Sequence, residues 1–448
     1  MSPTTPDPTK LSAAEKDALI QSQAAQLREA LARIAALEAR LAALPAPAKT
    51  PDNSSLPPSK GHKPNRPDKP KPKGPRLGSL GRKGSGRALC GNPDETVTAK
   101  PVRCHCCNAT FGQDDHTLDA RYDKIELPKF HPSSPAWNAT AAPACRSCGA
   151  TTLAPVPEGF EPGTPFSPNI MAAAIYLRII HAISYQRLSR LFLDLFGLAI
   201  SEGALDAGFG RHKPRVDAEV ATILARLRCS RVIQSDETGV RINGQGCWNW
   251  VFQNADVVIH VVRRSRGADV VAEVLGDHRP ALWGSDLYGA QQGHAEEWQV
   301  CLAHQLRDGQ YAIDAGDAVF APRMKALLLR AVVIARRHRG LAASTRRAYR
   351  RRLESDLDTG MALAPATKDG KRLRKRYGKV RSHLFTFLDY PEITADNNSS
   401  ERELRPTATD RKVTGGFRSV WGADFHAGIR SVIGTAKRRG TGRRRVAG

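Results

Sequence analysis

The sequence predicts a multidomain α/β protein, built around a mixed β-sheet that is flanked by helices and interrupted by a helical insertion. Three observations favour this class. The chain has 448 residues, which is too long for one ordinary domain. Apolar residues make up 41% of it, which is enough for at least one sizeable core. After Ser230, strand-like apolar stretches alternate with helical ones, as in sheets with crossover helices.

The charge of the chain indicates its partner. Its 68 Lys and Arg residues exceed its 44 Asp and Glu residues by 24, and they recur in several separate segments. Lys and Arg neutralise phosphates and release counterions, so we expect a nucleic acid, with a merely soluble basic protein or a membrane-surface binder as alternatives. No apolar run reaches about 18 residues and the start lacks a signal-peptide pattern, so we expect a cytoplasmic protein without membrane spans.

Residues 1–48 are expected to form a zipper-like helix of a coiled coil. Apolar residues recur every seven positions, and a second seam becomes apolar in its later half. The first seam holds Ile20, Leu27, Ile34 and Leu41, and the second holds Gln23, Ala30, Leu37 and Leu44. Pro45 and Pro47 end the pattern. It predicts a homo-oligomer; the alternative is one amphipathic helix packed on its own protein.

Residues 49–100 are expected to form a basic linker. The stretch from Lys49 to Arg87 is rich in Pro, Gly, Ser, Lys and Arg and cannot bury a core. It would serve as a solvated spacer, as a basic arm along DNA phosphates, or as both.

Residues 101–155 are expected to form a small zinc-binding domain. The nine cysteines do not suggest a disulfide framework, but four of them make two Cys-x-x-Cys pairs. These expected ligands are Cys104, Cys107, Cys145 and Cys148. Four thiolates suit a closed tetrahedral Zn²⁺ site, which can hold together a unit with little core. His105 and Cys106 are substitute ligands, and unrelated reduced cysteines are the alternative.

Residues 156–228 are expected to be helical. Ser167 and Pro168 have the residue types of a helix N-cap and first turn. Two further helices are expected on either side of Gly197, with Ser201 capping the second. The pattern is typical of a helix-turn-helix that binds DNA, and a plain helical hairpin fits equally well.

Residues 229–410 are expected to hold the sheet, in the order β-β-β-α-β-α-β. The first strand would end at Asp236 and the fourth at Asp286. The expected strands are 231–236, 247–253, 256–262, 281–286 and 298–304, with the first crossover helix at 267–276. A very basic helical insertion is expected at about 320–380 and a basic tail at 411–448.

Three acids, Asp236, Asp286 and Glu401, are candidate metal ligands. The aspartates leave strand ends, where α/β sheets commonly place their sites, and Glu401 starts a helix. Like charges raise one another's pKa, and Mg²⁺ or Mn²⁺ would relieve that cost. Two such ions about 3.5–4 Å apart can activate a hydroxyl and stabilise the leaving oxygen of a phosphodiester. Each acid taken singly has an alternative interpretation: an Asp at a strand end is often a cap, and a Glu on a helix is usually solvated. Tyr288 would stack or position near the site.

Four stretches resemble the insertion-sequence-66 family of transposases. They are "SDETGVRINGQGCWNWVF", "GSDLYGA", "CLAHQLRD" and "NNSSERELRP". The layout is similar as well, with a zipper-like helix, a "NSSLPPSK" linker from Asn53 to Lys60 and cysteine knuckles. The resemblance covers nearly all of the chain and implies an RNase H-like DDE catalytic domain with a helical insertion.

By this resemblance, the catalytic and metal-binding roles fall to Asp236, Asp286 and Glu401. Cys301 and His304 match the C-x-x-H element of the family and would line or orient the site, as would Arg402. A core cysteine with a capping histidine is the alternative for that pair.

Two positions depart from the family pattern. Leu287 stands where the family usually has a small residue, and "QLRD" follows the C-x-x-H element in place of a doubly basic pair. In the glutamate motif, Glu403 is the rival of Glu401.

The resemblance implies a bacterial, nucleoid-associated transposase that cleaves the terminal repeats of its element and transfers the strands to target DNA. Accessory proteins encoded by the element would be further partners. Two alternatives stay open: a non-catalytic DNA-binding protein derived from a transposase, and a general RNase H-like nuclease.

Overall fold

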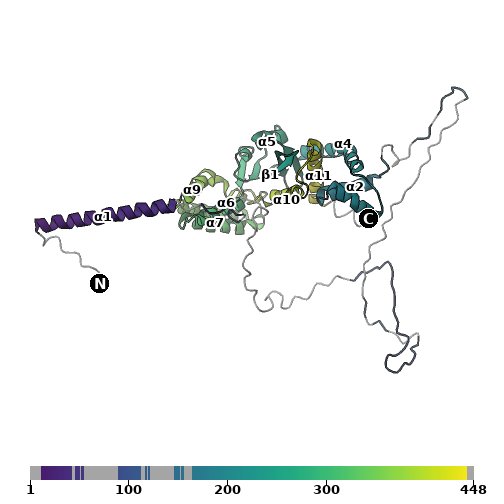
Figure 1. Cartoon of the computed structure of the whole chain (residues 1–448), viewed down its shortest axis with the longest axis horizontal. Helices are drawn as coiled ribbons and strands as arrows, with labels where there is room; N and C mark the ends of the chain where they lie inside the picture. The colour runs from purple at the N-terminus through teal and green to yellow at the C-terminus, as the bar shows by residue number, and fades with distance from the viewer. Residues whose placement is uncertain are drawn as a thin grey trace. The chain divides into compact units, whose positions relative to one another are not determined.

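The structure is a computed structural model that describes residues 12–42, 46–50, 52–54, 89–112, 117–118, 120–121, 146–151, 153–155 and 164–440. The chain divides into two compact units, one of residues 62–214 and one of residues 1–61 with 215–448 (Figure 1). The sheet lies in the second unit. No helix among the described residues is long and apolar enough to span a membrane.

Five strands form one mixed sheet in the order β3-β2-β1-β4-β5. β1, β2 and β3 make an antiparallel meander, and β4 and β5 extend the other edge of β1 in parallel. The strands are β1 Val232–Ile242, β2 Gln245–Gln253, β3 Val258–Arg263, β4 Leu282–Ser285 and β5 Glu297–Val300. Asn243 and Gly244, both with positive φ, make the tight turn between β1 and β2. The prediction of a mixed α/β fold is confirmed.

Three details of the expected strand order are wrong. β1 does not end at Asp236 but continues, because its second half pairs with β2 in the hairpin. Between β4 and β5 the structure has the short 3₁₀ helix η2 (Gly289–Gln291), where we expected an α-helix. β5 ends at Val300, and His304 lies in helix α6 (Leu302–Asp314), whose buried residues recur at helical spacing.

The two faces of the sheet are covered by different helices. One face carries Trp250 and Trp283 and is covered by α5 and the end of α4. The other carries Val251 and is covered by α10 and α11. These helices are α4 Glu202–Leu227, α5 Ala268–Leu275, α10 Asn398–Thr414 and α11 Val420–Arg438. Successive residues of a strand point to opposite faces, so neighbours in β1 meet different helices.

The segment expected as a basic tail, residues 411–448, holds the end of α10 and the whole of α11 instead. Phe425 and Ile429 of α11 are buried, and Ser431 Oγ accepts a 2.8 Å hydrogen bond from the backbone N–H of His260 on β3. Because Arg and Lys are frequent near the end of the chain, the sequence pattern does not indicate this buried face. α11 is therefore part of the folded unit.

His260 gives the fold a pH dependence. Burial lowers its pKa well below the usual value, and the charges of Arg430, His426 and Arg438 lower it further. Because the unfolded chain takes up the proton first, this contribution to stability is present above about pH 6.5 and is lost as the pH falls. We expect the urea midpoint to drop more steeply between pH 7.5 and 5.5 in the wild type than in His260→Gln. Equal slopes would contradict this.

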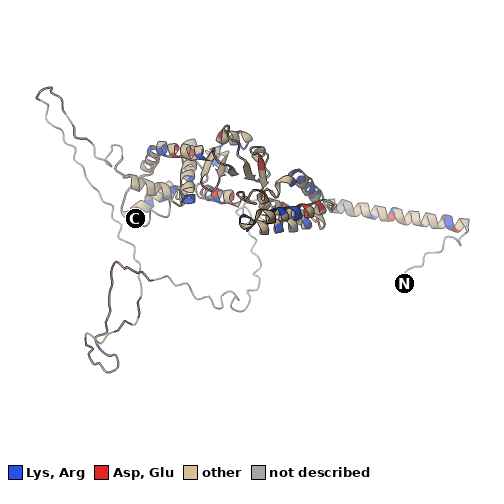
Figure 2. Cartoon of the chain, turned by 180° about the vertical axis from the view of Figure 1, so that it is seen from behind, with Lys and Arg blue, Asp and Glu red and all other residues tan. Residues whose placement is uncertain are grey.

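Helices fill the segment in which we expected an insertion. α7, α8 and α9 share a core with α6 around Phe320, Leu357 and Tyr377, all fully buried. The helices are α7 Phe320–Ala335, α8 Ala343–Met361 and α9 Lys368–Val380, with short 3₁₀ helices η3 His338–Gly340, η4 Arg381–His383 and η5 Thr386–Leu388. Many of their exposed residues are Lys and Arg, which Figure 2 draws in blue.

A short piece of the linker is anchored on α6. Asn53 is 4% exposed, and its amide donates a 2.8 Å hydrogen bond to Asp314 Oδ2. Asn53 Oδ1 accepts from Thr50 N at 2.7 Å, and Ser54 Oγ donates to the Thr50 carbonyl. Asn53, the first residue of the "NSSLPPSK" motif, is thus tied to the helix that follows β5. Residues 55–88 lie outside the described residues.

The unit of residues 62–214 contains α2, α3 and the first part of α4. α2 spans Pro168–Ile180 and α3 spans Tyr185–Phe196. Ser167 caps α2 as expected, and Gly197 ends α3 in the left-handed conformation. Ser201 Oγ accepts a backbone N–H at the start of α4. Both a helix-turn-helix and a helical hairpin have this arrangement, so DNA binding by this unit stays a prediction.

Helix α1 (Ala13–Ala42) occupies most of the expected zipper. Ser12 and Glu15 form a reciprocal capping box, with Ser12 N donating to Glu15 Oε2 at 2.8 Å. The described members of the first seam are more than half exposed, namely Ile20, Leu27 and Ile34. The side chains of Leu41 and Leu44 lie outside the described residues. An exposed apolar stripe is what a second helix would bury, and self-association stays a prediction.

Candidate active site

Asp236 lies within β1, and Asp286 directly follows the end of the parallel strand β4. β1 pairs with β4 at a constant offset of 50 residues, through Val232–Leu282, Ile233–Trp283 and Gln234–Gly284. Asp236 lies two residues beyond the last of these pairs and Asp286 follows the end of β4. The negative charge of Asp286 raises the pKa of Asp236, so the two carboxylates are near neighbours. Each carboxylate is held locally, since Asp236 Oδ1 accepts from Glu237 N and Asp286 Oδ1 accepts from Tyr288 N, both at 2.9 Å.

Side-chain amides fix the start of α10 on the sheet. Asn397 Nδ2 donates a 2.7 Å hydrogen bond to the carbonyl of Ser235, the residue before Asp236. Gln253 Nε2 on β2 donates to Ser400 Oγ at 2.7 Å. Both bonds are buried, so they hold the first turn of α10 firmly against β1 and β2. Glu401, the next residue of that turn, is therefore presented toward the end of β1.

The three predicted acids are close enough to repel one another. Burial raises the pKa of Asp236 well above its usual value, and the negative charges of Asp286, Glu237 and Glu401 raise it further. The backbone N–H of Glu237 only partly opposes this. The structure thus brings Asp236, Asp286 and Glu401 together, with more negative charge than the neighbouring groups compensate.

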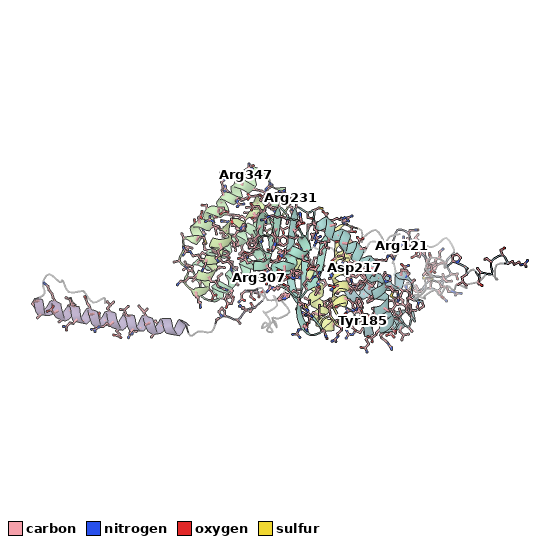
Figure 3. The ribbon with its side chains drawn as sticks, turned by 90° about the horizontal axis from the view of Figure 1, so that it is seen from above. Arg121, Tyr185, Asp217, Arg231, Arg307 and Arg347 are labelled. Carbon is pink, nitrogen blue, oxygen red and sulfur yellow. The ribbon has the colours of Figure 1, made fainter. Side chains whose placement is uncertain are left out.

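Glu401 also faces a cation. Arg307 of α6, labelled in Figure 3, reaches Glu401 Oε1 with Nη2 at 3.2 Å. His304 Nε2 lies 3.7 Å from the same oxygen. Burial lowers the pKa of His304, although Asp286 and Glu401 oppose the shift, so the ring is neutral at neutral pH. Arg307 is accordingly the charged partner of Glu401, and His304 is a neutral neighbour.

Cys301 orients the start of α10. It is buried, and its Sγ accepts a 3.2 Å hydrogen bond from Asn397 N. Burial raises the pKa of its thiol to about 12, so the sulfur stays protonated at neutral pH. A neutral thiol is a poor nucleophile and a poor metal ligand, and its contact with Asn397 supports an orienting role.

The side chains of the remaining motif residues are exposed or have partners other than the three acids. Arg402 is exposed on α10. Glu403 pairs with Arg430 and Arg438 of α11 at 3.3 Å each, so it belongs to the packing of α10 on α11. This pairing favours Glu401 over Glu403 as the acid of the site. Tyr288 follows Asp286 closely and stacks on an arginine, Arg266, with 3.9 Å between the guanidinium carbon and the ring centroid.

Sequence reasoning missed Arg307 as a site residue. Cys301, His304 and Arg307 are spaced by three, which places them along one face of a helix. The sequence predicts a strand over Cys301 and His304, and in a strand residues three positions apart point to opposite faces. The helical period of α6 is the signal that would have found Arg307.

The donor chemistry of the three acids fits Mg²⁺ or Mn²⁺. Hard divalent cations prefer carboxylate oxygens, and a cation among these acids would relieve the repulsion that raises the pKa of Asp236. Across the described residues, no three His, Cys, Asp or Glu side chains already form a group that could hold a metal ion. The acids therefore match the ion in type and charge.

One of the two cysteine pairs is fully described. Cys104 and Cys107 lie in one turn, where hydrogen bonds from the backbones of Cys107 and Cys106 lower the pKa of the Cys104 thiol. A lowered pKa favours the thiolate, which is the form that binds Zn²⁺. Cys148 is described as well, but Cys145 lies outside the described residues. The four-cysteine zinc site stays a prediction.

Comparison with known protein families gives a match over the region that contains the sheet. The protein-family model described as "Transposase IS66 family" matches residues 163–425, which is more than half of the chain. The matched range holds the whole sheet, the insertion helices and the three acids. None of the curated proteins compared with the chain matches it.

Proposed function

The chain belongs to the IS66 family of transposases, and on that premise we propose that it cuts DNA at the ends of an insertion sequence and joins those ends to target DNA. Asp236, Asp286 and Glu401 would form the catalytic centre. One observation carries the proposal: the charges of Asp286 and Glu401 act on Asp236, across three segments far apart in the sequence. A carboxyl group whose pKa is raised by burial and by neighbouring acids is common at functional sites.

The three carboxylates would hold Mg²⁺ or Mn²⁺. When bound, the ions would activate a water or a 3′-hydroxyl for in-line attack on a phosphodiester and stabilise the departing oxygen. The protein would contribute positioning. Asn397 and Gln253 would keep Glu401 on the sheet, and Arg307 would direct its carboxylate.

Two successive reactions would use this one site. In the first, water attacks the phosphodiester at an end of the element and frees a 3′-hydroxyl. In the second, that hydroxyl attacks a phosphodiester of target DNA. Both are displacements at phosphorus, so the same carboxylates and the same basic surroundings would serve each step.

The remaining segments would assemble the DNA complex. The exposed seam of α1 supports a homo-oligomer, and the lowered pKa of Cys104 supports a structural zinc site. The linker and the exposed Lys and Arg of α8 and α9 would bind phosphates and keep the protein at the nucleoid. Small accessory proteins of the element would be further partners.

The test of the proposal is DNA cleavage by the full-length chain. One duplex would end in the inverted repeat found beside the gene, and a second would carry the same bases in scrambled order. We expect a nick at the repeat end, leaving a 3′-hydroxyl, in Mg²⁺ but not in EDTA. The scrambled duplex should stay intact.

Other outcomes would favour the alternatives. Tight binding of the repeat without any cleavage in Mg²⁺ or Mn²⁺ would support a DNA-binding protein derived from a transposase. Equal cleavage of both duplexes would support a general nuclease.

A further inference from the structure

Glu237, the residue after Asp236, is buried on the opposite face of the sheet. Its side chain is 1% exposed, and both oxygens are occupied. Oε1 accepts from Arg266 Nε at 3.0 Å and from Arg266 Nη2 at 2.7 Å, and Oε2 accepts from Gln291 Nε2 at 2.7 Å. A buried carboxylate with three charge-assisted or amide hydrogen bonds is a rigid anchor.

Arg266 is more exposed than its partner but makes further contacts. Its guanidinium lies between two aromatic rings, 4.3 Å from the centroid of Trp248 and 3.9 Å from that of Tyr288. Arg266 comes from the connection between β3 and α5, and Trp248 comes from β2. The planar guanidinium can stack and donate two hydrogen bonds to one carboxylate oxygen at the same time, which lysine cannot do.

Two members of this cluster come from the connection that carries Asp286. Tyr288 and Gln291 follow Asp286 by two and five residues, and Tyr288 N donates to the Asp286 carboxylate. Glu237, on the other side of the cluster, adjoins Asp236. The cluster therefore links the segment of one aspartate to the segment of the other.

The cluster contacts a segment of the chain that lies beyond the paired part of β4. β4 pairs with β1 up to Gly284 and with β5 up to Ser285, so strand pairing ends one residue before Asp286. The connection from Asp286 to Gln291 depends on side-chain contacts for its position. The Glu237–Arg266 pair supplies such contacts on the face of the sheet opposite to Asp236.

We propose that Glu237 and Arg266 are positioning residues that hold the connection bearing Asp286 in place beside Asp236. The inference rests on the proposed function, because positioning matters for the metal ions that the aspartates would share. Loss of either residue would loosen the connection and weaken metal binding, while the aspartates themselves stay in the chain.

Hydrogen exchange tests the positioning directly and without metal. We expect Glu237→Gln and Arg266→Gln to speed amide exchange in peptides that cover residues 286–292 of the full-length chain. Arg266→Lys should give an intermediate result, because lysine restores the charge but not the stacked fork. The matched control is Arg263→Gln, three residues earlier, where Arg263 pairs with Glu273 on the surface. This control should exchange as the wild type does.

Mn²⁺ binding tests the consequence for the site. Calorimetric titration with Mn²⁺ in the absence of DNA should show affinity about 10-fold weaker in Glu237→Gln and Arg266→Gln and unchanged in Arg263→Gln. In cleavage, the Mg²⁺ concentration for half-maximal rate should rise by a similar factor, with little change in the rate at saturating Mg²⁺. A general loss of folding would instead lower the saturating rate.

The outcomes separate this inference from the proposed function. Unchanged exchange in both variants would overturn the positioning role, whatever the wild type does with DNA. Faster exchange with unchanged Mn²⁺ affinity would overturn it as well. A wild-type chain that neither binds Mn²⁺ nor cleaves the repeat would overturn the proposed function, and the exchange data would still decide whether the link holds the connection.

Discussion

Asp236→Asn should reduce Mg²⁺-dependent cleavage of the repeat duplex by about 10³-fold or more while DNA binding stays within about 2-fold. Asparagine keeps the shape of the side chain but removes the charge that would hold the ions at the centre of the site. The exposed Lys and Arg residues that would bind DNA phosphates are unchanged by this substitution, so affinity should survive. Cleavage is measured with an end-labelled duplex, and affinity with the same duplex in EDTA. Nicking at the wild-type rate would remove Asp236 from the catalytic centre.

The same substitution should stabilise the metal-free fold. The pKa of Asp236 is raised by burial and by neighbouring acids, so ionisation of this group is costly only in the folded state. A raised carboxyl pKa favours the fold at low pH, and that contribution is lost as the pH rises through the folded value. The variant should therefore gain over the wild type between pH 4.5 and pH 8.

Urea unfolding in EDTA at both pH values measures this gain. Asp256→Asn is the matched control, because Asp256 is exposed in the turn between β2 and β3. It should leave the urea midpoint unchanged. A wild type that is the more stable protein at pH 8 would show that the acids of the site are compensated within the chain.

Glu401→Gln should impair cleavage, whereas Glu403→Gln should impair stability. Glu401→Gln should abolish cleavage with normal folding, because Glu401 faces Asp236 and Arg307 at the edge of the site. Glu403→Gln should lower the free energy of unfolding by about 2–3 kcal/mol, since it leaves Arg430, whose side chain is 6% exposed, without its carboxylate. Its cleavage rate per folded molecule should stay near that of the wild type.

The two substitutions are isosteric and two residues apart, so each controls for the other. Urea midpoints report stability, and cleavage rates corrected for the folded fraction report catalysis. If Glu403→Gln alone stopped cleavage at full stability, the assignment of the third acid would move from Glu401 to Glu403.

The sequence predicts the parts of this fold that depend on local pattern. Short apolar stretches predict the strands around Asp236 and Asp286, and the cap of Ser167 and the turn at Gly197 follow from residue type. The end of β1 is not predicted correctly, because two acids in a strand look like its end. They are tolerated there only because the pairing with β2 continues past them.

The site was only partly predictable for a related reason. The three acids follow from residue type and family resemblance, but their partners depend on tertiary packing. Arg307 meets Glu401 because α6 and α10 approach, and Arg266 meets Glu237 across 29 residues of chain. The sequence predicts a tail in place of α11 because Arg and Lys dominate its end, although Phe425 and Ile429 are buried.

Asp236 and Glu237 are consecutive residues that serve opposite faces of one strand, and this has a consequence for how the gene can change. Losing or gaining one residue within β1 before Asp236 would turn each of these two carboxylates to the other face of the sheet. A single substitution in the hairpin leaves the face of each carboxylate unchanged, whereas a shift of the strand by one residue exchanges the two faces. Natural length variation in this stretch should therefore gather at the Asn243–Gly244 turn, where an added residue leaves the parity of the strand untouched.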